Sequence, residues 1–298
     1  ILEELQGRYL VREVENGEDI SFEFTHNKLR EFIYGLQSTS RRRILHNRIA
    51  QVLEKRLTGG FEDRLLYPSL IYHFSNGGNK LSALDYRIKN LDKYSDFSHE
   101  LYPVLYENVK VENQTFINQE ESIKHLEELE VQLKETKGLG RTQDILRLEL
   151  ALYYIKGRYC IQEGEYNLGV KATEEMLELA GKAEDYLYVM KGCRQMIYYG
   201  IQIHNTELMQ EYLDKGMLLA SRYDQMKEMG IFLRLKGLQR LMTEKYDEAE
   251  ETLKHSIGIF ESLNRQEDRY SLNIAAAYNY IGEIRRYNMR FNEALKYY

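Results

Sequence analysis

The stretch 244–264, EKYDEAEETLKHSIGIFESLN, carries the clearest hydrophobic pattern in the chain. Its apolar and small side chains follow one another at intervals of three or four residues, as Tyr246, Ala249, Leu253, Ile257 and Phe260. Residues at these intervals lie on one face of an α-helix, so an amphipathic helix is predicted over 244–264. From about Phe61 to Tyr298 the pattern continues helix after helix, with short turns such as SNGGNK and QEGEY between them.

The same register returns with a period of about 40 residues, within the range of helical repeats. Small or apolar residues recur at two of its positions, as Gly169, Met209 and Ala249 and as Met176, Gly216 and Ser256. Two stretches also share one spacing of a glycine, an aromatic residue and an alanine: Gly237-x8-Tyr246-x2-Ala249 and Gly282-x8-Phe291-x2-Ala294. Small residues let two helices approach closely, and the aromatic side chain fills the gap between neighbouring helix pairs.

These residues resemble tetratricopeptide repeats, whose period is roughly 34 residues. The resemblance implies a mainly α fold, a right-handed superhelix of helix pairs, and the period of about 40 implies longer helices than usual. The pattern is firm over 153–298. Residues 65–135 fit degenerate pairs of the same kind, and the pattern does not place the repeat boundaries within 61–140.

A different pattern occupies residues 1–57. The stretch YLVREVENGEDISFEF predicts two short strands around Asn16-Gly17, a dipeptide typical of the tight turn of a β-hairpin. Phe22 and Phe24 alternate with polar residues, which predicts one buried face on the second strand. Two helices follow, and their apolar residues are expected to point inward: Leu29, Phe32, Ile33 and Leu36 in the first, and Ile44, Leu45, Ile49, Val52 and Leu53 in the second.

The order helix, hairpin, helix, helix is compatible with a winged-helix module over 1–57, followed by the helical repeats over 58–298. Paired glycines, Gly59 and Gly60, predict a mobile joint at 58–62 between the two domains. The stretch 137–141, KGLGR, is a second expected site of early proteolysis.

The segments FEFTHNKLREFIY and RRRILHNRIAQVLEKR together resemble a known winged-helix segment. It is the one that follows the nucleotide-binding domain in the STAND class of signal-transducing ATPases, to which large bacterial transcriptional activators with helical repeats belong. The similarity rests on the strand-then-histidine junction at His26 and on Arg43 with His46 in the next helix.

This resemblance implies that His26 reaches the phosphate of ATP or ADP bound in the neighbouring domain and holds a closed, inactive state. An imidazole can donate a hydrogen bond to a phosphate oxygen or pair with it as a cation. The alternative is that the His26 ring caps the strand end or bonds a backbone carbonyl.

The charge is unevenly distributed. Between Lys28 and Arg56 there are eight basic and two acidic residues, so this segment carries +6 and the remainder −12 of the net −6. The segment can face an anionic partner, dock on another domain, or form a solvated face. The basic run Arg41–Arg43 stands at a helix start rather than within a recognition helix, and no direct nucleic-acid contact is expected.

The remaining composition narrows the class of protein. Apolar residues make up 43% and charged residues 30%, and no run of 18 apolar residues or apolar leader is present, so no membrane partner is expected. Cys160 and Cys193 have no metal-ligand spacing, which favours reduced thiols in the cytoplasm. The chain starts at Ile1 and stops within a helical pattern, which favours a fragment of a longer protein.

Catalytic chemistry is not expected. The seven histidines show no metalloprotease spacing, neither cysteine has a base beside it in sequence, and no Gly-x-x-x-x-Gly-Lys-Ser/Thr loop is present. The fragment is therefore predicted to be no enzyme and to hold no metal and no cofactor. ATP or ADP would bind only in the parent protein, in the nucleotide-binding domain upstream of this fragment.

Projecting the repeat register forward places one set of side chains on the inner groove of the superhelix: Tyr154, Arg158, Arg194, Tyr198, Arg234, Asn279, Glu283 and Arg286. Arg194 and Arg234 are one period apart and should lie on neighbouring repeats. Arginines in a row suit a carboxylate or an acidic peptide, because the guanidinium forms forked hydrogen bonds. Pairing with glutamates of adjacent helices is the alternative.

Two functions follow from these observations. The favoured one is a non-catalytic, effector-sensing fragment of a STAND-type transcriptional regulator, whose groove binds a protein, a peptide or a small molecule. The other is a stand-alone interaction scaffold or peptide sensor of the tetratricopeptide type, with residues 1–57 as a docking cap.

Overall fold

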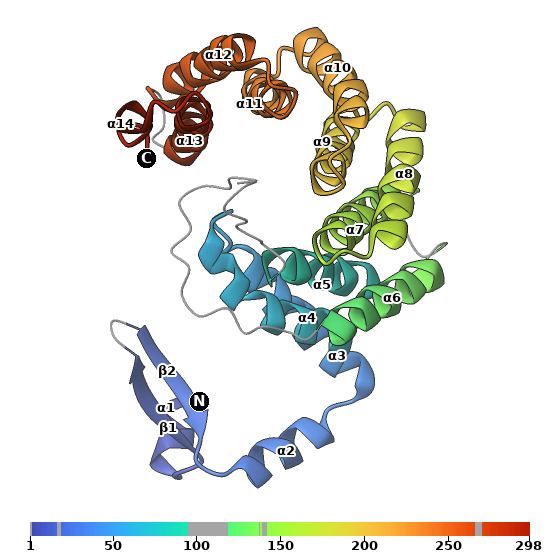
Figure 1. Cartoon of the computed structure of the whole chain (residues 1–298). Coiled ribbons are helices and arrows are strands. Elements are labelled where there is room, and N and C mark those ends of the chain that lie inside the picture. The colour runs from blue at the N-terminus through green and yellow to red at the C-terminus, as the bar shows by residue number, and fades with distance from the viewer. Residues whose placement is uncertain (1, 17–18, 95–118, 137, 139–141, 266–269) are drawn as a thin grey trace. The chain divides into compact units, whose positions relative to one another are not determined.

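The computed structural model describes residues 2–16, 19–94, 119–136, 138, 142–265 and 270–298. They form two compact units, Ile1–Arg87 and Ile88–Tyr298. The described residues are mainly helical and contain a single two-stranded sheet (Figure 1). The prediction of a mainly α chain with one β-hairpin is confirmed.

The first unit begins with the predicted order of elements. Helix α1 (Leu2–Gly7) precedes strands β1 (Val11–Asn16) and β2 (Asp19–Phe24), which are followed by α2 (Asn27–Leu36) and α3 (Thr39–Glu54). The strands pair antiparallel, with Val11 opposite Phe24. Ser38 caps α3 by accepting a hydrogen bond from the Arg41 amide, 3.2 Å. The unit continues through the 3-10 helix η1 (Phe61–Leu65), α4 (Tyr67–Gly77) and the start of α5 (Lys80–Tyr94).

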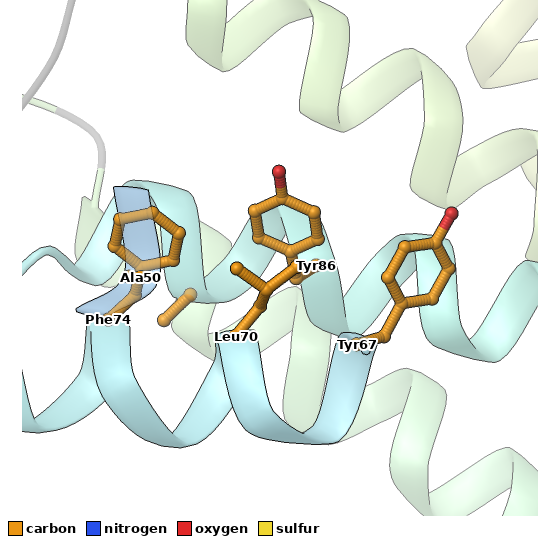
Figure 2. Packing of buried hydrophobic residues seen from close by; sticks show 6 residues of the cluster. Ala50, Tyr67, Leu70, Phe74 and Tyr86 are labelled. Atoms are coloured by element: carbon orange, nitrogen blue, oxygen red, sulfur yellow. The ribbon is translucent and has the colours of Figure 1, made fainter. Parts of the chain in front are cut away.

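The core of this unit lies where α3, α4 and α5 meet. It is a cluster of buried residues: Ala50, Tyr67, Leu70, Phe74, Ala83 and Tyr86 (Figure 2). The rings of Phe74 and Tyr86 stack with their centroids 5.7 Å apart, and the Tyr86 hydroxyl donates to Glu54 Oε1 at 2.8 Å. The compact unit therefore runs on to Arg87, whereas the sequence placed the domain boundary after residue 57.

Several side chains predicted to point inward lie at the surface of the unit. Phe32 and Leu36 of α2 are 63% and 67% exposed, and Phe22 and Phe24 of β2 are also exposed. On α3, Ile44, Leu45, Ile49 and Val52 are exposed as well. The prediction of buried stripes is wrong here, because α3 packs its other face, with His46 and Ala50, against α4.

A single carboxylate, that of Asp63, holds the backbone at the start of the predicted joint, 58–62, by hydrogen bonds. Asp63 is buried and accepts hydrogen bonds from the Thr58 amide (2.9 Å, Oδ1) and the Gly59 amide (2.8 Å, Oδ2). Gly59 has φ 82, a left-handed conformation that glycine adopts without strain. The second predicted cleavage site, 137–141, lies outside the described residues except for Gly138.

The second unit is a succession of helices: α6 (Gln119–Thr136), α7 (Thr142–Gln162), α8 (Tyr166–Lys182), α9 (Tyr186–Gln202), α10 (Thr206–Arg222), α11 (Met226–Met242), α12 (Tyr246–Asn264), α13 (Ser271–Tyr287) and α14 (Phe291–Ala294). From α6 onward each helix packs against the next (Figure 1). In addition, α7 contacts α9, α9 contacts α11, and α11 contacts α13. Helices α8, α10 and α12 begin at Tyr166, Thr206 and Tyr246, so their starts are evenly spaced along the chain.

One turn recurs between these helices. From α7 to α12 each connection has three residues, and its middle residue has a positive φ: Gly164, Glu184, His204, Asp224 and Glu244. In four of these turns the next residue donates its amide back to a carbonyl in the last turn of the helix, as Asp185 does to Ala180 (2.9 Å) and Asn205 to Gly200 (2.8 Å). This is the Schellman arrangement that ends a helix. A left-handed residue therefore recurs once per helix, at a constant interval.

Candidate functional site

The predicted groove residues lie on four helices of the second unit. Tyr154 and Arg158 belong to α7, Arg194 and Tyr198 to α9, and Arg234 to α11. Four of these five lie close together: Tyr154, Arg194, Tyr198 and Arg234. Their proximity follows from the pKa of the Tyr198 phenol, which Arg194, Arg234 and Tyr154 all influence electrostatically. Burial raises the pKa of Tyr198, and the two guanidinium groups act in the opposite direction. Arg158 joins the group through Tyr154, since its guanidinium lies 5.3 Å from the centroid of that ring.

Two of the arginines lie against carboxylates of other helices. Arg158 Nη2 is 2.7 Å from Asp92 Oδ1 of α5, and Arg194 Nη1 is 3.4 Å from Glu228 Oε2 of α11. Such pairing is the alternative to a ligand-binding row of arginines. Arg234 is 1% exposed. Binding of a carboxylate ligand by these arginines stays a prediction.

The residues on α13 form a group of their own. Arg286 Nε donates to Glu283 Oε2 at 2.9 Å, and Glu283 Oε1 accepts from the Tyr298 hydroxyl at 2.5 Å. Burial acts to raise the pKa of Glu283, but these bonds together lower it. Asn279 lies on the same helix and is partly buried.

Sequence reasoning missed two residues beside Tyr154. The Lys191 ammonium lies 4.3 Å from the ring centroid of Tyr188 and 5.1 Å from that of Tyr154, and the two rings meet edge to face at 6.4 Å. Burial and Asp185 raise the pKa of Tyr188 to about 12. The signal was present in the sequence, because Tyr188, Lys191 and Arg194 follow one another at intervals of three and share one side of a helix.

Buried polar contacts fix the position of this group. Gln195 Nε2 donates to the Tyr154 carbonyl at 2.7 Å, and the Thr173 hydroxyl lies 2.9 Å from Gln195 Oε1. A side chain at Gly157 would collide with Gln195 and Thr173, so this glycine lets α7, α8 and α9 approach one another. The cations and aromatic rings of α7 and α9 are thus held in place by residues of three helices.

His26 precedes α2 with extended backbone angles, φ −131 and ψ 124. Its ring is exposed and makes no capping hydrogen bond, while its carbonyl accepts from the amides of Leu29 (3.1 Å) and Arg30 (3.2 Å). The ring therefore does not cap the start of α2. Contact with a nucleotide phosphate stays a prediction.

The first unit carries two sets of exposed apolar side chains, together called the α2–α3 face: Phe32 and Leu36 on α2, and Ile44, Leu45, Ile49 and Val52 on α3. At about 100° per residue, Ile44, Ile49 and Val52 fall on one side of α3, opposite the buried His46 and Ala50. Exposed Arg41 and Arg48 fall on the same side as the apolar residues of α3. Apolar side chains grouped on an exposed helix side are typical of interaction sites.

Among the described residues, no group of three or more histidine, cysteine, aspartate or glutamate side chains is placed to hold a metal ion. None of the helices described above combines the length and the apolar character that a membrane span requires. Cys160 and Cys193 are free and buried, and burial raises the pKa of each thiol to about 11.

Comparison with known proteins informs the fold alone. No protein-family model matches the chain, and no curated protein matches it in sequence. The crystal structure of BtubC (BKLC) from P. vanneervenii is similar over 88% of each chain, with a TM-score of 0.51 and 13% sequence identity. At this identity the similarity extends to a shared helical architecture and not to a ligand or a partner.

Proposed function

We propose that this chain is a non-catalytic regulatory part of a STAND-type transcriptional regulator in the cytoplasm. The first unit docks on a nucleotide-binding domain, and the helical second unit binds the effector that shifts that domain between states. The observation that carries the proposal is the α2–α3 face, which follows the strand-then-histidine junction at His26.

The chemistry of the α2–α3 face defines the partner. Six apolar side chains lie exposed on two successive helices, and burying them against another protein is favourable at about 25 cal/mol per Å². Arg41 and Arg48 lie among the apolar residues of α3, so the partner surface is acidic around an apolar centre. His26, exposed at the start of α2, would then face the nucleotide phosphate.

For the second unit we propose a right-handed superhelix of tetratricopeptide-like pairs, with the repeat period predicted from the sequence. The even spacing of the starts of α8, α10 and α12 and the left-handed turn that ends each helix from α7 to α11 support this arrangement. The inner helices α7, α9 and α11 carry the cations and aromatic rings described above, which suit a peptide, a protein segment or a small molecule with a carboxylate.

A docking experiment tests the proposal. The nucleotide-binding domain that the proposal requires is expressed separately and titrated with this chain by calorimetry. Ile49→Asp places a charge in the α2–α3 face and should abolish binding, whereas Leu218→Asp, at a leucine of α10 that is 60% exposed, should bind as the unchanged chain does. Equal binding by both variants would contradict docking through this face.

The second candidate function is an interaction scaffold or peptide sensor with no nucleotide switch. It is favoured if the natural protein carries no phosphate-binding loop domain before this chain. In that case the second unit should still bind its ligand when residues 1–57 are altered by Ile49→Asp, because the first unit is then only a docking cap.

A further inference from the structure

Three side chains of the first unit form a hydrogen-bonded chain across three helices. Tyr34 Oη of α2 and His46 Nε2 of α3 are 2.9 Å apart, and His46 Nδ1 and His73 Nδ1 of α4 are 2.8 Å apart. His46 is 6% exposed, and His73 is partly buried. This chain ties α2 and α4 to α3 at a point separate from the α2–α3 face.

A hydrogen bond between two Nδ1 atoms depends on where the protons are. One of the two nitrogens must carry a proton and the other must offer its lone pair. A single positive charge is compatible with the bond, because a His73 imidazolium can donate from Nδ1 to a neutral His46. When both rings are imidazolium, two N–H groups face each other across 2.8 Å, and the bond is lost.

The surroundings disfavour the second charge. The groups that face the pair are Tyr34 from α2, Arg42 from α3 and Tyr72 from α4, whose ring meets those of both histidines edge-on at 5.5 and 5.1 Å. Arg42 is a cation that also lies over the Tyr34 ring at 5.2 Å. Burial and Arg42 lower the pKa of His46, and burial and His46 lower the pKa of His73.

We infer that His46 and His73 form a proton-operated latch, which ties α4 to α3 at neutral pH and loosens that contact when both imidazoles are protonated. The direction in which pH changes the stability follows from the linkage between proton binding and folding. Both pKa values are lowered below the unfolded value of about 6.5, so the unfolded unit binds more protons and the stabilisation present above that pH is lost as pH falls.

Hydrogen exchange on the whole chain tests the latch locally. Protection of the amides of α3 and α4, corrected for intrinsic rates, should fall about tenfold per unit of pKa depression between about pH 7 and pH 5. His73→Gln keeps a side-chain donor for His46 and leaves His46 as the one histidine of the pair that titrates, so its protection should change less over that range than in the unchanged chain. His255→Gln makes the same change at an exposed histidine of α12 and should behave as the unchanged chain does.

An equal loss of protection in the unchanged chain and in His73→Gln would overturn the latch. If His73→Gln fails to fold, imidazole NMR titration of the unchanged chain decides. The pair should titrate in two coupled steps, with the second well below the first. Independent titration of both rings near their ordinary pKa of about 6.5 would overturn the inference. A chelator in every sample excludes a metal ion held by the two imidazoles as the cause.

Discussion

Arg194 of α9 and Glu228 of α11 form an ion pair of 3.4 Å, with side chains that are 9% and 15% exposed. The pair joins α9 and α11, which also contact each other elsewhere along their lengths. Loss of one member leaves the other charge buried without that partner, which is costly in a poorly solvated site.

Glu228→Gln should therefore destabilise the second unit by about 1–3 kcal/mol, in the range for a buried polar group that loses its partner. Thermal unfolding followed by circular dichroism measures the change. Glu261→Gln, at an exposed glutamate of α12, is the matched control and should be near neutral. If Glu228→Gln is also neutral but changes ligand affinity, then the pair serves binding rather than folding.

Replacing a glycine by alanine should change the free energy of unfolding in opposite directions at Gly237 and at Gly258. In Gly237→Ala the new methyl group would lie 2.6 Å from Leu253 Cγ, so α11 and α12 must separate, at a cost of about 1–3 kcal/mol. In Gly258→Ala nothing lies within 4 Å, and the helix gains about 0.5–1 kcal/mol from reduced chain entropy. Denaturant titration of both variants distinguishes the signs.

Ala249 of α12 is fully buried. Ala249→Arg should cost about 2–4 kcal/mol, because it overpacks the contact with α11 and buries a charge. A melting temperature close to that of the unchanged chain would contradict the close helix contact at this position.

The left-handed turn residues offer a stabilising change. Glu244 has φ 59, which costs a residue with a side chain about 1–2 kcal/mol relative to glycine. Glu244→Gly should raise the melting temperature of the second unit, and Gly164→Ala, at φ 83, should lower it. Calorimetric scans of the two variants would contradict the turn geometry if both shift the temperature in one direction.

Asp63 controls the predicted joint. Asp63→Ala removes the acceptor of the Thr58 and Gly59 amides and should expose 58–62 to limited proteolysis well before the unchanged chain is cut. Glu62→Ala, an exposed neighbour, is the control. Equal cleavage rates in the two variants would mean that Asp63 does not hold this loop.

Much of the second unit was predictable because its pattern is local and its partners are the next helices in the chain. The stripe of 244–264 becomes α12, Tyr246–Asn264, with Ala249, Leu253 and Phe260 buried against neighbouring helices. Hydrophobic periodicity specifies which face is buried, and the adjoining helix supplies the surface.

In the first unit, the pattern of the sequence does not predict which helix faces are buried. The sequence predicts an apolar stripe on α3, but Ile44 and Val52 of that stripe are exposed while His46 and Ala50 are buried on the face that packs on α4. Hydrophobic periodicity indicates that one face of a helix is apolar. It does not indicate whether that face packs within the same chain or against another protein. In the same way, the Arg194–Glu228 pair and the His46–His73 bond join residues far apart in sequence, and no spacing rule indicates them.

The left-handed turn that ends each helix from α7 to α11 also bears on how the second unit unfolds. Each helix packs mainly on its nearest neighbours in the chain, so the unit has low contact order and behaves as a row of locally coupled segments. Such a row frays from its ends and can open piecemeal. A ligand held by α7, α9 and α11 together would couple segments that otherwise open separately, and binding would be recorded as sharper, more cooperative unfolding even without any change of shape.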